Sequence, residues 1–125
     1  MEKEFVPYSL ALKLKELGFD EPCFAIYGKS EGYLFKIHTD KFDTVDELHF
    51  IKAPTYSQAF RFFREKYMLS GEIYIFKNIW NFDIEDISNS IQLYTSDIMC
   101  YNSYEEAELE CLKKLIEIAK EQNVK

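Results

Sequence analysis

The strongest constraint on the fold is an aromatic-rich stretch in the middle of the chain, residues 53–69, whose spacing predicts a helix. Aromatic and small residues recur there every three or four positions, as on the side of a helix that lies on a core. This stripe consists of Tyr56, Ala59, Phe60, Phe63 and Tyr67. Thr55 followed by Gln58 is a capping-box pattern for the helix start, and Gly71 is a reasonable stop. We therefore expect the rest of the fold to be built on this helix.

The opposite side of the predicted helix carries two apolar residues, Phe62 and Leu69, among charged ones. Two interpretations stay open: another element covers them, or they face a partner. Arg61 and Arg64 lie together beside the stripe, where they could jointly receive a carboxylate or a phosphate. The alternative is that Arg61 pairs with Glu65 at i,i+4 spacing while Arg64 is solvated.

Length and composition predict one globular domain over residues 1–125. Hydrophobic residues make up 47% of the chain, and no apolar run approaches the ~20 residues that cross a bilayer. We therefore expect no membrane partner. Cys23, Cys100 and Cys111 are odd in number and widely spaced, and the first residues contain no apolar signal region. These features favour a cytoplasmic protein.

The net charge of −7 argues against nucleic acid as a partner, because such binding depends on Lys and Arg that neutralise phosphates. The acidic residues within 40–47 lack the alternate spacing and central glycine of an EF-hand. We expect a solvated loop or a turn of helix over residues 40–52.

Hydrophobic patterns on either side of the central stretch predict the other elements. Helices are expected at 7–17 and 104–120, one hairpin at 23–27 with 33–38, a second at 72–77 with 79–85, and a further strand at 90–94. The predicted fold is α+β. It is a two-layer sandwich in which an antiparallel sheet of four to five strands, built from two hairpins, is covered by three helices. The order is helix, two strands, helix, two or three strands, helix.

No arrangement of catalytic residues stands out. His38 and His49 occur in no zinc or metalloprotease spacing, and no nucleophile has an evident base. Asp83 and Glu85 fall on one strand face and, with Lys77, could form a metal-dependent nuclease site. Two acids on the wet face of a sheet are more often simply solvated. We therefore assign no catalytic, cofactor-binding or metal residues, and expect no cofactor.

Three helical blocks carry a resemblance to a known group. They are EFVPY at 4–8 with ALKLKELGFDEPC at 11–23, APTYSQAFRFFREK at 53–66, and YEEAE at 104–108 with LKKLIE at 112–117. In these blocks the chain resembles small proteins of unknown function from Bacteroidetes genomes and their phages. The resemblance implies an intracellular, mobile-element setting and carries over no activity and no functional residues.

The leading hypothesis is a non-enzymatic cytoplasmic binding or protein-interaction module, a phage-related or mobile-element accessory protein. It would self-associate through apolar surface that includes Phe62 and Leu69. The alternative is a protein that binds a small anionic ligand or nucleotide through Arg61 and Arg64. The metal-dependent nuclease is a third hypothesis.

Overall fold

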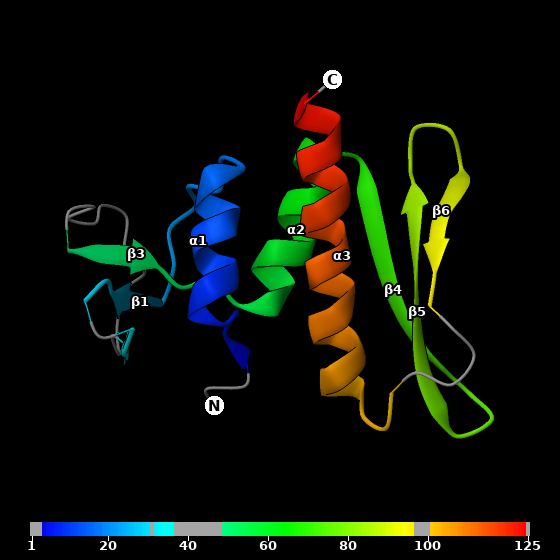
Figure 1. Ribbon diagram of the computed structural model, residues 1–125, viewed down its shortest axis with the longest axis horizontal. Coiled ribbons are helices and arrows are strands. Elements are labelled where there is room, and N and C mark those ends of the chain that lie inside the picture. The colour runs from blue at the N-terminus through cyan, green and yellow to red at the C-terminus, as the bar shows by residue number, and fades with distance from the viewer. Residues whose placement is uncertain (1–3, 31, 37–48, 97–100, 125) are drawn as a thin grey trace. The chain divides into compact units, whose positions relative to one another are not determined.

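The computed structural model of the chain describes residues 4–30, 32–36, 49–96 and 101–124. Within these residues the fold is α+β, with three helices and two antiparallel three-stranded sheets. The chain divides into two compact units, a first unit of residues 1–59 and a second unit of residues 60–125. The boundary falls inside helix α2 (Tyr56–Lys66), and each unit contains one of the sheets (Figure 1).

The first unit begins with helix α1 (Tyr8–Glu16), close to the predicted 7–17. Pro7 stands at the N-cap, where its fixed backbone angle suits entry into a helix. Gly18 ends the helix with a φ of 102°, and its N–H donates to the carbonyl of Lys15 at 3.0 Å. The helix predicted at residues 7–17 is confirmed, with a glycine in the left-handed conformation just after its end.

The sheet of the first unit has the order β2-β1-β3, with strands β1 (Ala25–Gly28), β2 (Leu34–Lys36) and β3 (Phe50–Lys52). The predicted first hairpin is confirmed, and β1 is the central strand of the sheet. One face of the sheet is buried and carries Ala25, Tyr27 and Ile51. Strand β3 was missed, because its three residues fall in the segment interpreted as a loop; the acids of 40–47 lie outside the described residues.

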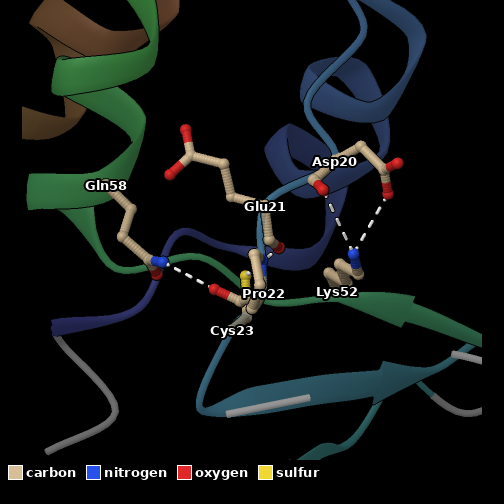
Figure 2. Close-up of polar contacts among 6 residues, drawn as sticks. All are labelled: Asp20, Glu21, Pro22, Cys23, Lys52 and Gln58. Atoms are coloured by element: carbon tan, nitrogen blue, oxygen red, sulfur yellow. Dashed lines mark hydrogen bonds and ion pairs between the residues drawn. The ribbon is translucent and has the colours of Figure 1, made fainter. Parts of the chain in front are cut away.

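Polar contacts fasten residues 20–22 to two other parts of the first unit (Figure 2). The Lys52 ammonium donates to the Asp20 carboxylate at 3.0 Å and to its carbonyl at 3.4 Å. The Gln58 side-chain amide donates to the Pro22 carbonyl at 2.9 Å. Gln58 also forms the predicted capping box with Thr55, since each side chain accepts the other's backbone N–H, at 3.1 and 3.2 Å.

The second unit contains strands β4 (Leu69–Phe76), β5 (Ile79–Asp86) and β6 (Ile91–Thr95) in the order β4-β5-β6, followed by helix α3 (Tyr104–Val124). Lys77 and Asn78 join β4 to β5 and both have positive φ, as a tight type I′ hairpin turn requires. The predicted second hairpin, further strand and last helix are all present. Helix α3 packs along β4 and β5 (Figure 1).

The central helix is shorter than predicted, because α2 ends at Lys66 rather than at residue 69. Met68 follows with a φ of 55°, a left-handed conformation that interrupts the helical path. Leu69 is therefore the first residue of β4. The prediction that it lies with Phe62 on one side of the helix is wrong, because Leu69 is not part of the helix. Gly71, expected to stop the helix, lies inside the same strand.

The sequence predicts a single sheet of four to five strands, whereas the structure has two sheets of three strands. In each sheet a third strand pairs with one strand of a predicted hairpin. β1 has β2 and β3 as neighbours, and β5 has β4 and β6. Alternation in the sequence predicts a strand but does not identify the neighbours it pairs with.

The single domain over residues 1–125 stays a prediction. None of the helices in the described part of the chain has the length and apolar character that a membrane span requires.

Candidate interaction surface

The sheet of the second unit has two faces of different character. Gly71 of β4 lies against the α3 residues Cys111 and Leu115, and Phe82 and Ile84 of β5 share this face and are buried. The other face is here called the open face. It carries Glu72, Tyr74 and Phe76 of β4, Ile79, Asn81, Asp83 and Glu85 of β5, and Thr95 of β6, which the strand registers place side by side. The prediction that Asp83 and Glu85 lie on one strand face is therefore confirmed.

A hollow of about 590 Å³ lies on the open face. Its lining residues are Tyr74, Phe76, Lys77, Ile79, Asn81, Thr95 and Ser96. Its aromatic side chains are accessible: Phe76 is 57% exposed and Tyr74 is 37% exposed. A volume within the range of typical ligand pockets, lined by aromatic residues and a few polar ones, is the usual composition of a binding site.

Hydrogen bonds fix the polar side chains beneath the hollow. The Ser96 hydroxyl accepts the backbone N–H of Phe82 at 3.0 Å and donates to the Asn81 side-chain oxygen at 3.3 Å. The Asn81 amide nitrogen donates to the carbonyl of Ile79 at 3.0 Å. Asn81 and Ser96 are both buried, so these bonds hold them in place and make the floor of the hollow rigid.

Asp83 gives the open face its charge and a free acceptor. The hydroxyls of Thr95 and Tyr74 both donate to its Oδ1, the latter at 3.4 Å. No hydrogen bond from the described residues reaches Oδ2, which can therefore accept one from a bound molecule. Glu72 stands directly opposite Asp83 on β4, and like charges in that position repel. Glu85 adds a third negative charge to the same face.

Asp83 and Glu85 of the open face are the acids that the metal-dependent nuclease hypothesis invokes. Among the described residues, no group of three or more His, Cys, Asp or Glu side chains could hold a metal ion. The Lys77 ammonium, which the nuclease hypothesis placed beside Asp83 and Glu85, instead lies 5.4 Å from the centre of the Phe76 ring. The arrangement suits attraction of a cationic group better than metal-assisted hydrolysis.

The other residues singled out from the sequence lie elsewhere. Phe62 is 6% exposed and Leu69 is 0% exposed, so neither offers accessible apolar surface in this structure. The Phe62 ring packs edge-on against Phe63, with the ring centres 5.3 Å apart. Arg61 and Arg64 are both exposed on α2, as the anionic-ligand hypothesis requires.

The first unit contains a second candidate, a hollow between α1 and β3. Ala11, Lys15, Phe19, Asp20, Phe50, Ile51 and Lys52 line it. Its volume is about 20 Å³, room for a single water molecule, and Lys52 is engaged by Asp20. His49 is exposed at the start of β3, and His38 lies outside the described residues. These features do not form a ligand site.

Sequence reasoning missed the hollow although the signal was present. Tyr74 and Phe76 alternate with Ile73 and Ile75, so β4 is apolar on both faces. A strand that is apolar on both faces, beside a strand with one polar face, indicates an exposed aromatic surface when helices cover only one face of the sheet. The exposed face could be identified only from the structure, because the sequence does not show that α3 covers the face of β4 that carries Ile73.

No family model, curated protein or solved structure matches this chain.

Proposed function

We propose that this protein is a non-enzymatic protein-interaction module and that the open face of the β4-β5-β6 sheet receives the partner. The observation that carries the proposal is the hollow of about 590 Å³, with exposed aromatic side chains above a fixed polar floor. Exposed aromatic side chains are characteristic of interface cores, where they supply much of the binding energy.

The charges on the open face indicate the chemistry of the partner. Glu72, Asp83 and Glu85 lie on this face, and the whole chain has a net charge of −7. Mutual repulsion between Glu72 and Asp83 would be relieved by a cation placed between them. The Tyr74 ring beside them can also receive an ammonium or guanidinium group. The partner is therefore a protein segment that carries Lys or Arg together with an apolar anchor for the hollow.

The cellular setting is part of the same proposal. The resemblance of the helical blocks to small proteins of Bacteroidetes genomes and their phages supports a cytoplasmic accessory role. Such a role requires binding of another protein and no chemistry of its own.

A substitution in the lining of the hollow tests the proposal. Thr95→Arg places a bulky cation at the exposed Thr95 position and removes the hydroxyl that donates to Asp83. Binding is measured by fluorescence anisotropy with short peptides in which Lys alternates with Leu or Phe, and with matched peptides in which Glu replaces Lys. The Lys peptides should bind, the Glu peptides should not, and Thr95→Arg should weaken binding at least about tenfold, or ~1.4 kcal/mol.

The matched control is Gln122→Arg, which adds the same charge at an exposed position of α3. It should bind the Lys peptides with close to wild-type affinity. Equal binding of Lys and Glu peptides, or equal effects of the two substitutions, would contradict the proposal.

A small anionic ligand held by Arg61 and Arg64 is the alternative, favoured by the exposure of both side chains on α2. Thermal-shift measurements with nucleotides test it. A stabilisation that Arg64→Ala abolishes would support this function, and no shift with any nucleotide would count against it.

A further inference from the structure

β4 is an edge strand of its sheet, and its second half is unprotected. Ile75 is 53% exposed, and Tyr74 and Phe76 beside it are also exposed. Its register with β5 runs without a bulge from Leu69 to Phe76, and the run from Ile73 to Phe76 contains no charge and no proline. Natural edge strands usually carry a lysine, a proline or a bulge that prevents pairing with another chain. The absence of these devices from 73–76 indicates a strand that accepts a partner strand.

The backbone groups that face the free edge can be identified from the hydrogen bonds of β5. The N–H of Trp80 donates to the Tyr101 carbonyl, and the Phe82 carbonyl accepts the N–H of Ser96, so both residues direct their backbone groups away from β4. Because these directions alternate along a strand, Asn81 directs its groups toward Tyr74, its partner on β4.

It follows that Ile73 and Ile75, on either side of Tyr74, direct their backbone groups toward the free edge. No hydrogen bond from the described part of the chain satisfies these groups. The ligand that satisfies such a row of donors and acceptors is an extended strand.

We propose that this strand is β4 of a second copy of the chain, paired antiparallel about a two-fold axis at Tyr74. In this register Tyr74 stands opposite Tyr74 of the second copy, and Ile73 stands opposite Ile75 of the second copy. Hydrogen bonds then join the Ile73 and Ile75 groups, and the two three-stranded sheets become one continuous sheet. The inference goes beyond the proposed function and does not depend on it.

Charge complementarity favours a second copy over an unrelated strand. The same register places Glu72 opposite Phe76 of the second copy, on the same face. In each chain the Lys77 ammonium lies over the Phe76 ring, 5.4 Å from its centre. Glu72 therefore meets Lys77 of the second copy, and the two-fold axis repeats this ion pair at the other end of the interface.

A charge-swap experiment tests the proposal. Wild-type protein should sediment as a monomer–dimer equilibrium in analytical ultracentrifugation, and Glu72→Lys and Lys77→Glu should each weaken dimerisation by at least about tenfold. The double variant should recover most of the loss, because it restores opposite charges. Glu85→Lys is the matched control, since it changes the same charge on β5, away from the edge, and should dimerise like wild type. Circular dichroism confirms that every variant is folded.

A crosslinking experiment tests the register. Tyr74→Cys in a Cys100→Ser background should form a covalent dimer on mild oxidation, because facing residues of a non-hydrogen-bonded pair lie close together. Thr95→Cys in the same background, on the edge strand β6, should not. A wild-type protein that stays monomeric at ~1 mM, a double variant no better than the singles, or equal crosslinking at both positions would overturn the proposal. Thr95→Arg should leave dimerisation unchanged, so failure of this proposal and failure of open-face binding are distinguishable.

Discussion

Replacing Gly71 by alanine should destabilise the second unit, because Gly71 of β4 lies against α3 with too little space for a methyl group. A methyl carbon built at Gly71 would lie 2.7 Å from the Cys111 sulfur, 3.2 Å from Leu115 Cδ1 and 3.4 Å from Phe60 Cε2. The first distance is well inside van der Waals contact, which is reached at ~3.5–4.0 Å between carbon atoms. Cys111 is fully buried, so moving its sulfur would disturb the packing of the core.

The expected loss of stability follows from two opposing effects. Overpacking of a close-packed core costs ~1–3 kcal/mol, and replacing glycine within a strand regains ~0.5–1 kcal/mol of backbone entropy. The middle values of these ranges leave a net loss of about 1 kcal/mol in the free energy of unfolding of Gly71→Ala, measured by urea denaturation followed by circular dichroism. Ser70→Ala, on the opposite face of β4, is the control and should change stability by less than ~0.5 kcal/mol.

A double-mutant cycle with Cys111→Ala isolates the clash. Removing the sulfur makes room for the new methyl group, so the double variant should be more stable than the sum of the single changes by about 1 kcal/mol. A Gly71→Ala protein as stable as wild type would refute the close approach. If the changes in free energy of unfolding of the two single variants simply add in the double variant, the new methyl group does not clash with the Cys111 sulfur.

Three other substitutions test local parts of the fold. Ser103→Ala removes the hydroxyl that accepts the Glu106 N–H at 3.2 Å at the start of α3 and should cost ~1 kcal/mol in urea denaturation; no change would contradict a capping role. Gln58→Glu keeps the side-chain oxygen that accepts the Thr55 N–H but removes the buried amide that donates to the Pro22 carbonyl. It should lower the free energy of unfolding by ~1–3 kcal/mol, and unchanged stability would show that this bond contributes little. Desolvation raises the pKa of Glu108 above 4.5. The stability of wild type relative to Glu108→Gln should therefore be greatest below pH 4.5 and should fall as the pH rises through the folded-state pKa. Denaturation at pH 4 and pH 7 measures this difference, and the opposite slope would contradict the burial of Glu108.

The elements that could be predicted from sequence are those whose signals are local. The last helix has its capping serine, Ser103, and a continuous apolar side; the second hairpin has clear alternation on β5. The end of α2 could not be predicted, because Met68 adopts a left-handed conformation that is uncommon for a side chain of its type. Strand β3 is only three residues long and is defined by pairing with β1, a non-local contact.

The candidate surface was predicted only in part, for a related reason. Phe62 seemed available for a partner because a helical projection shows its phase but not the ring that packs against it, that of Phe63. Asp83 was placed correctly on the polar face, whereas its acceptance of hydrogen bonds from Tyr74 and Thr95 depends on three strands meeting in register. Side chains brought together across strands leave no fixed spacing in the sequence.

The most direct test of the central claim is a ¹⁵N–¹H NMR titration of the protein with the Lys-containing peptides. If the open face is the binding surface, the amides of Tyr74, Asn81 and Thr95 should shift progressively, while those on the exposed side of α3, such as Lys113 and Glu117, should not. The Glu-containing peptides should produce no shifts. Shifts confined to α3, or equal shifts with both kinds of peptide, would contradict the account.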